Sequence, residues 1–262
     1  MDPSHTPLIP AQAGIQSHLH GGTGPWPWVP ACAGTSGLSQ SDPDGSTARG
    51  CQPATFGVVL FDFTLNQLVL RLVALVFIAG VHGAAVAAAA CALGDQGPRY
   101  DGRLRLNPLA HLDLLGTLSG VLFSIGWAKP IAIDPTALRP GRIGLVLIVI
   151  AGAAATLLIA FALLLVRPML MPLLADTASQ TVFALIETIG QLSLWFALVN
   201  LLPVPCLTGG HLLTALMPAW RDLLRRSQHY AAVLLTILAG IGVVTGALGG
   251  AYRVLAGAVM GE

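Results

Sequence analysis

A long apolar run over residues 68–93 places the strongest constraint on what this chain can fold into. At about 1.5 Å per residue, a helix of roughly 20 apolar residues crosses the hydrocarbon core of a bilayer. The stretch Asp62-Phe63-Thr64-Leu65 ahead of the run offers a helix cap, and Gly94 to Pro98 after it supplies residues that end helices. The run therefore predicts a membrane-spanning helix.

The composition extends this interpretation to the whole chain. Of the 262 residues, 55% are hydrophobic and only 10% are charged, and the mean hydropathy is +0.76. The net charge of +1, with both signs scattered along the chain, excludes the basic surface of a nucleic-acid-binding protein. We expect an all-α integral membrane protein, a polytopic helical bundle whose surroundings are the lipid bilayer.

Other apolar segments add further membrane helices. Residues 143–166, 181–202 and 231–256 each have the length of a span, whereas 109–127 contains polar residues and three glycines. Segment 109–127 could form either a span or a shorter re-entrant helix. Basic residues on both sides of it leave its orientation in the membrane open. Together the segments predict about four to six membrane helices.

Charged and apolar residues alternate over residues 103–106. Alternation with a period of two is typical of a half-buried strand. We therefore expect a short β-strand or hairpin element near 99–107 and 128–134.

Residues 1–55 differ from the rest of the chain. They are rich in Pro, Gly, Ser and Thr and hold no Lys or Arg before Arg49, unlike a secretory signal peptide. The lack of a periodic apolar pattern predicts disorder. Two interpretations stay open: a translated flexible leader, or sequence upstream of a natural start near residues 58–60. We expect a membrane-embedded domain over 56–262.

The first predicted span carries His82 near its middle. An ionisable side chain at that depth costs free energy, so it marks either a functional site or what is left of one. The four cysteines show neither CxxC pairing nor the spacing of metal ligands. Cys91, nine positions after His82, faces the opposite side of the helix.

Three sequence blocks in order resemble the site-2 proteases, the intramembrane zinc metalloproteases, in their compact prokaryotic form. The blocks are the helix with His82, GRLRLNPLAHLDLLGT at 102–117 and NLLPVPCLTGG at 200–210. The segments GWAKP at 126–130 and Ala-Gly at 151–152 also fit that family. The resemblance covers about half of the chain. It implies a bundle of the site-2 protease type, multi-pass in the bacterial cell (inner) membrane.

The same resemblance implies a degenerate active site. In active members a helix bears His-Glu-x-x-His, whose histidines bind zinc while the glutamate activates the metal-bound water. The resemblance aligns His82 with the first histidine, Gly83 with the glutamate, Val86 with the second histidine and Thr208 with a third ligand, an aspartate. Glycine and valine cannot replace these groups, and a threonine hydroxyl is a poor zinc ligand. We expect no catalytic residues and no bound metal, with His82 as a vestigial ligand position.

Other polar residues could line a groove, have structural roles or rebuild a metal site. They are His111, Asp113, Glu187, Asn200, Cys206 and His211. In the family, the block with His111 accompanies zinc ligands placed elsewhere, which favours structural roles. Glu187, inside a predicted span, either reaches the lipid headgroups or pairs with an Arg or His within the bundle.

Three functions are consistent with the sequence. The first is a catalytically inactive homologue, a pseudoprotease that binds or shields transmembrane segments of other proteins beside the Pro-Val-Pro break at 203–205. The second is an active intramembrane zinc metalloprotease that cleaves transmembrane substrates with non-standard ligands. The third is transport through a polar cleft.

Overall fold

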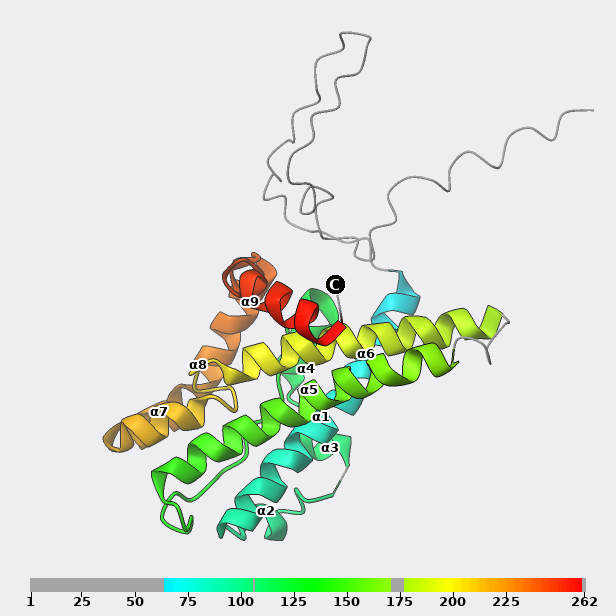
Figure 1. Ribbon diagram of the computed structural model, residues 1–262. Helices are drawn as coiled ribbons and strands as arrows, with labels where there is room; N and C mark the ends of the chain where they lie inside the picture. The colour runs from blue at the N-terminus through cyan, green and yellow to red at the C-terminus, as the bar shows by residue number, and fades with distance from the viewer. Residues whose placement is uncertain (1–63, 106, 171–176, 261–262) are drawn as a thin grey trace, which may run out of the picture. The chain divides into compact units, whose positions relative to one another are not determined.

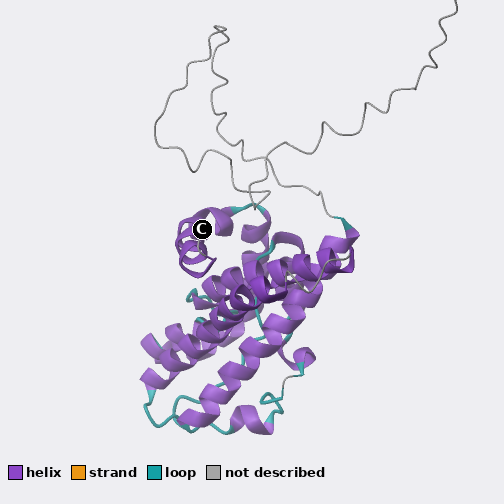
Figure 2. Ribbon diagram, turned by 45° about the vertical axis from the view of Figure 1, so that its right-hand side comes forward, coloured by secondary structure: helices purple, strands orange, loops and turns teal. Residues whose placement is uncertain are grey.

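The computed structural model of this protein describes residues 64–105, 107–170 and 177–260, and these residues form helices joined by loops (Figure 1). Figure 2 shows no β-strand among them. The expected all-α fold class is therefore confirmed for the described residues. The leader expected at 1–55 lies outside them, so its disorder stays a prediction.

Three long helices carry most of the apolar sequence: α1 (Leu65–Leu93), α5 (Arg142–Leu170) and α6 (Thr177–Leu201). Each is long and apolar enough to cross a membrane, because about 20 helical residues span a hydrocarbon core of roughly 30 Å. Helices α5 and α6 lie side by side, and α1 packs against both (Figure 1). The candidate site lies among these three helices.

The ends of α1 follow from its capping residues. The Thr64 hydroxyl accepts a hydrogen bond from the backbone N–H of Gln67 at 3.4 Å. Gly94 ends the helix with a φ of 123°, a conformation that a residue with a Cβ rarely adopts. The N–H of Arg139, just ahead of α5, donates to the Leu93 carbonyl at 2.8 Å. The end of α1 therefore lies beside the start of α5, and the two helices are antiparallel.

The segment expected as a span or a shorter helix takes the shorter form. It consists of α3 (Pro108–His111) and α4 (Leu114–Phe123). At about 1.5 Å per residue, α4 extends roughly 15 Å, which is about half of a bilayer core. It packs against α1 and against α8 (Arg221–Gly240). This segment does not cross a membrane as one helix.

The strand or hairpin element expected near 99–107 and 128–134 is wrong for the described residues. Instead, the chain forms a helical turn, α2 (Gly97–Tyr100). Pro98 has the backbone angle of a helix start, and the Asp95 carboxylate accepts the first N–H of the turn at 2.9 Å. A helical turn therefore occupies the start of the segment where a strand was expected.

One small element of strand pairing is present. Leu112 and Ala128 form an isolated antiparallel bridge. Upstream, the Arg103 guanidinium donates to the Ala110 carbonyl at 2.6 Å. This contact holds the segment against α3, so its four alternating residues do not extend along a partner strand.

The last apolar segment is bent. Helices α8 and α9 (Val243–Met260) meet at a bend of 75°, and Gly242 between them has a φ of 78°. The span expected over 231–256 is therefore divided between two helices, which together form either one broken span or a re-entrant pair. By length and composition, the described residues hold three helices that could cross a membrane, or four if the bent pair counts as one. Among the described residues, the count therefore reaches four, the lower end of the expected four to six, only if the bent pair is one span.

Between α6 and α8 the chain forms a loop at 202–209, then α7 (Gly210–Leu216) and the short 3-10 helix Pro218–Trp220. The first Gly of α7 is two positions after Thr208. Helix α7 packs against α5. The packing of α7 against α5 therefore places Thr208, in the loop just ahead of α7, close to the three long helices.

Candidate functional site

The candidate site is built around His82 in α1, whose side chain is 1% exposed. His82 lies eleven positions before Leu93, the last residue of the helix. That is about 16 Å along the axis, near the middle of a bilayer core. A polar ring at that depth needs partners inside the protein. Gly152 of α5, Phe196 of α6 and Thr208 of the following loop surround it.

Both ring nitrogens of His82 are hydrogen-bonded. Nδ1 lies 3.1 Å from the Gly152 carbonyl oxygen, and Nε2 lies 2.9 Å from Oγ1 of Thr208. A carbonyl oxygen can only accept, so Nδ1 carries the proton, and in the neutral ring Nε2 accepts from the Thr208 hydroxyl. The third neighbour is the Phe196 ring, 5.2 Å away between centroids. No carboxylate is among these contacts, which favours the neutral ring at this depth.

Helix α5 lies directly against Val86, which the resemblance aligns with the second family histidine. A Cβ built at Gly152 would lie 2.7 Å from Cγ2 of Val86 and 2.8 Å from Cε1 of His82. Glycine is therefore required where the α5 backbone passes these two side chains. Val86 is buried against this backbone. The Val86 side chain thus forms part of the contact between α1 and α5.

The space beside Gly83, which the resemblance aligns with the family glutamate, is filled by another side chain. A Cβ at Gly83 would overlap the imidazole ring of His111, which is 0% exposed. Nε2 of His111 donates to the Arg105 carbonyl at 3.3 Å, and Nδ1 has no partner among the described residues. Burial lowers the pKa of His111. Since the ring occupies the space beside Gly83, no larger side chain fits there without displacing it.

The residues of this site do not fit a zinc ion. Two ligands of a tetrahedral zinc, each at about 2.0–2.1 Å, are roughly 3.3 Å apart. Nε2 of His82 and Oγ1 of Thr208 are 2.9 Å apart, which is a hydrogen-bond distance. Within the described parts of the chain, no three side chains of the kinds that ligate metals (His, Cys, Asp and Glu) lie together in a suitable group.

Two of the other candidates have local structural contacts. Asp113 caps α4, because its carboxylate accepts the N–H of Gly116 at 2.8 Å. The Asn200 amide donates to the Phe196 carbonyl at 2.8 Å, and its backbone carbonyl accepts the N–H of Gly209 at 2.7 Å. Asn200 therefore joins the end of α6 to the loop that carries Thr208. Its side-chain oxygen is buried without a partner among the described residues.

The remaining candidates do not join the His82 site through any hydrogen bond among the described residues. His211 of α7 bonds the backbone of Ile131, and burial lowers its pKa to about 4. Cys206 is buried in the loop, and burial raises the pKa of its thiol to about 11. Glu187 of α6 is half-buried and has no ion pair or hydrogen bond with another described side chain.

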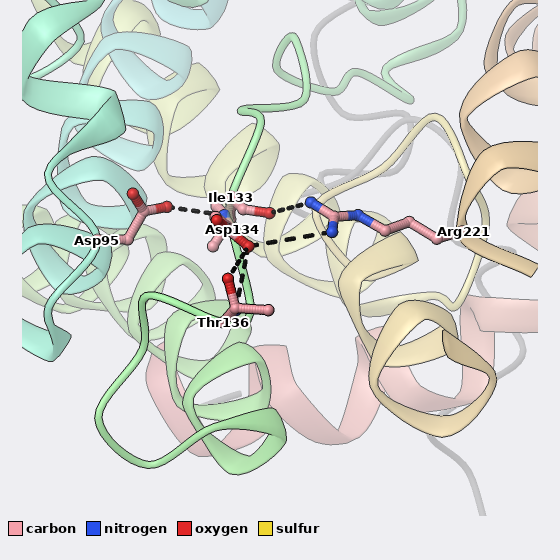
Figure 3. A network of polar contacts seen from close by, with 5 residues as sticks. All are labelled: Asp95, Ile133, Asp134, Thr136 and Arg221. Atoms are coloured by element: carbon pink, nitrogen blue, oxygen red, sulfur yellow. Dashed lines mark hydrogen bonds and ion pairs between the residues drawn. The ribbon is translucent and has the colours of Figure 1, made fainter. Parts of the chain in front are cut away.

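Sequence reasoning missed a polar network that joins the end of α1 to the start of α8 (Figure 3). The buried Asp95 carboxylate accepts the N–H of Asp134 at 2.8 Å, and the Asp134 carboxylate accepts from Thr136. Arg221 donates to the Ile133 carbonyl at 3.2 Å and lies 4.0 Å from Asp134. The ion pair is half exposed and contributes little. The backbone bonds fix the 131–136 segment that holds α7.

Sequence reasoning also missed the contact between Gly83 and His111. The sequence singles out both residues, but they are 28 positions apart, and no short-range pattern indicates that they share one space. The same holds for Gly152. The sequence identifies it as part of the Ala-Gly pair that fits the family, but does not indicate its contact with His82. Long-range packing of this kind becomes visible only in the folded chain.

These features define a helical membrane protein whose first span holds a buried, hydrogen-bonded histidine. Residues 166–244 match peptidase family M50. The Bacillus subtilis (strain 168) protein named "Putative zinc metalloprotease YwhC" is 33% identical over 165 residues, which are 60% of this chain and 74% of that protein. No solved structure matches the chain. The chain belongs to peptidase family M50, the site-2 protease family, which confirms the resemblance drawn from its motifs.

Proposed function

We propose that this protein is a catalytically inactive member of its family, multi-pass in the bacterial inner membrane, which binds or shields transmembrane segments of other membrane proteins. One observation carries the proposal. The position aligned with the catalytic glutamate is Gly83, and the His111 ring occupies the space beside it. A water molecule at that place would have neither a carboxylate to activate it nor room beside the helix.

The other two aligned positions support the same conclusion. Val86 packs against the α5 backbone at Gly152, and Thr208 donates its hydroxyl proton to His82. Peptide hydrolysis by a zinc enzyme needs three protein ligands and an open position for water. His82 is the one aligned ligand that is present, and both of its nitrogens are occupied by hydrogen bonds.

Binding of another transmembrane segment is supported by the irregular loop at 202–209. The N–H groups of Leu207, Gly209 and Gly210 bond to carbonyls of Val204, Asn200 and Leu207. Non-helical backbone at membrane depth is tolerated where protein or water surrounds it. In active relatives, the corresponding stretch lies beside the substrate groove. A chain that keeps this loop without the cleavage chemistry keeps the means to hold a segment.

An active enzyme with non-standard ligands is the competing function. One observation favours it: Nδ1 of His82 donates to a backbone carbonyl, the arrangement that orients many zinc-binding histidines and leaves Nε2 for the metal. In this protein the Thr208 hydroxyl takes that second nitrogen. Zinc is the cofactor that this alternative requires.

Metal analysis of the full chain, purified without a polyhistidine tag, separates the two functions. We expect zinc far below one equivalent, with the same content in the wild type, in His82→Ala and in the control His229→Ala. His229 is exposed on α8, away from the site. One equivalent of zinc that is lost in His82→Ala but kept in His229→Ala would overturn the proposal.

A further inference from the structure

A layer of short elements covers the middle of α1 (Figure 1). We call it the α3 layer, and it consists of residues 103–105, 107–112 and 128–130. Its His111 ring occupies the space beside Gly83 of α1. The Arg105 carbonyl accepts a hydrogen bond from this ring, and the His111 carbonyl accepts the N–H of Lys129 at 2.8 Å. Arg105 and Lys129 therefore both lie near the level of Gly83.

Helix α1 gives the depth of this level in the membrane. Gly83 lies twelve positions after Arg71 and twelve before Asp95, and the residues between these two are apolar or small apart from His82. Twelve positions correspond to about 18 Å along a helix, slightly more than half of a hydrocarbon core of roughly 30 Å. In a helix that crosses the membrane, Gly83 and the α3 layer beside it therefore lie near the middle of the core.

Two cationic side chains are exposed on the outer side of the α3 layer. Its inner residues are buried, with His111 at 0% and Ala128 at 2% exposed, whereas Arg105 and Lys129 are exposed. Neither cationic side chain has a hydrogen bond or ion pair with another residue of the described ranges. Headgroups are about 15 Å away, farther than a lysine or arginine side chain extends. Because lipid tails cannot solvate these charges, the outer side requires a different neighbour.

Apolar side chains of the same layer are exposed as well. Leu109 of α3 is 77% exposed, and Leu104 is 38% exposed. Water would solvate the two cations but not these leucines, and lipid would cover the leucines but not the cations. A transmembrane segment with a carboxylate near its middle complements both kinds of side chain. Pairing with a cation also offsets the cost of the carboxylate at that depth.

We infer that the outer side of the α3 layer binds transmembrane segments that carry an aspartate or glutamate near their middle. The carboxylate lies beside Arg105 and Lys129, and the apolar surface of the segment lies against Leu109. This inference rests on the proposed binding of transmembrane segments, and it adds a place and a selectivity. The loop at 202–209 lies at the same depth, because Thr208 bonds to His82. The loop and the α3 layer are thus two contact regions at one level of the membrane.

Two synthetic transmembrane peptides that differ in one residue test the carboxylate. Each is a helix of leucine and alanine with a central glutamate or glutamine, and its binding to the full-length protein in phosphatidylcholine vesicles is measured by fluorescence energy transfer. We expect the glutamate peptide to bind at least about tenfold more tightly, as for close charge pairs at interfaces. The difference should shrink in Arg105→Gln and in Lys129→Gln and be lost in the double variant. The control Arg167→Gln, at an exposed residue in the last turn of α5, should keep it.

A second pair of variants tests the apolar contact. Leu109→Gln should weaken the binding of both peptides alike, whereas Leu158→Gln, at an exposed α5 position outside the layer, should not. Equal binding of the two peptides, a difference that persists in the double variant, or unchanged binding in Leu109→Gln would overturn the inference and leave the proposed binding function standing. Binding of neither peptide would overturn both.

Discussion

Helical glycines are closely packed in one region of this protein and face open space in another. In α1 and α5, a Cβ at Gly83 would overlap the His111 ring, and one at Gly152 would lie 2.7 Å from Val86. In α9, no atom outside the immediate helix backbone lies within 4 Å of a Cβ at Gly246. Glycine is required by packing in the first region, whereas packing places no such requirement on it in the second.

The difference shows how the region around His82 is organised. A site that had only lost its ligands would leave a cavity or an unpaired histidine. Instead, His82 keeps two hydrogen bonds, His111 fills the space beside Gly83, and α5 closes against Val86. The substituted residues form a packed region in their own right. Variants that restore single family residues should therefore destabilise the protein without restoring activity.

The largest effect is expected for Gly83→Glu, which restores the family glutamate. The new side chain must displace the His111 ring, and its carboxylate is buried beside an unpaired imidazole nitrogen. Overpacking costs about 1–3 kcal/mol, occasionally more, and a buried charge adds to that. We expect a loss of stability of roughly 3 kcal/mol or more, measured as a lower melting temperature of the detergent-solubilised protein.

The double variant Gly83→Glu with His111→Ala distinguishes overlap from a general cost of glutamate in α1. Removing the ring opens the space that the glutamate needs. The loss of stability in the double variant should therefore be smaller than the sum of the losses in the two single variants. Strict additivity would show that Gly83 and His111 do not compete for one space. In that case packing would not require glycine at position 83, and α1 would not differ from α9 in this respect.

Gly152→Ala tests the contact between α5 and α1 with a single methyl group. The new Cβ would meet Val86 and His82 at less than 3.0 Å, so the helices must separate slightly. We expect a destabilisation of about 1–3 kcal/mol. Combining it with Val86→Ala should recover part of the loss, because the shortened side chain leaves room. A melting temperature equal to the wild type in Gly152→Ala would contradict close packing at this position.

Sequence reasoning was most successful where the signal is local. The length of the apolar runs predicted α1, α5 and α6, and the motif order predicted the family. The strand near 99–107 was wrong because four alternating residues are a weak signal, and the cap at Asp95 and the Arg103 contact to α3 decide the conformation. The bend at Gly242 has no hydropathy signal, since apolar residues continue on both sides.

Which residues form the site stays a prediction, whereas their contacts become visible only in the fold. The motif alignment identified His82, Gly83, Val86 and Thr208, and from their chemistry it predicted what they cannot do. The partners of these residues come from segments far away in the chain: the hydrogen bond from Thr208 to His82 joins residues 126 positions apart. Such pairs depend on how the helices assemble, which a single sequence does not encode in any short pattern.

Thr208→Val tests the hydrogen-bonded pair with an almost unchanged side-chain volume. Valine cannot donate to Nε2 of His82, which would remain buried without a partner. Leaving a buried acceptor unpaired costs about 1–3 kcal/mol. Thr208→Ser keeps the hydroxyl and should lie much closer to the wild type in melting temperature. If the valine variant were as stable as the serine variant, the hydroxyl would not be the partner of His82.

The smallest effect, with the opposite sign, is expected for Gly246→Ala in α9. No neighbouring side chain opposes the new methyl group, and alanine is favoured over glycine in a helix interior by up to about 1 kcal/mol. The melting temperature should therefore stay unchanged or rise slightly, while the same substitution at Gly152 lowers it. Because both variants add one methyl group to a long helix, helix propensity affects them alike, and their difference reports packing alone. A loss of stability at Gly246 similar to that at Gly152 would mean that α9 packs against a surface outside the described chain, and the contrast between the two regions would then no longer hold.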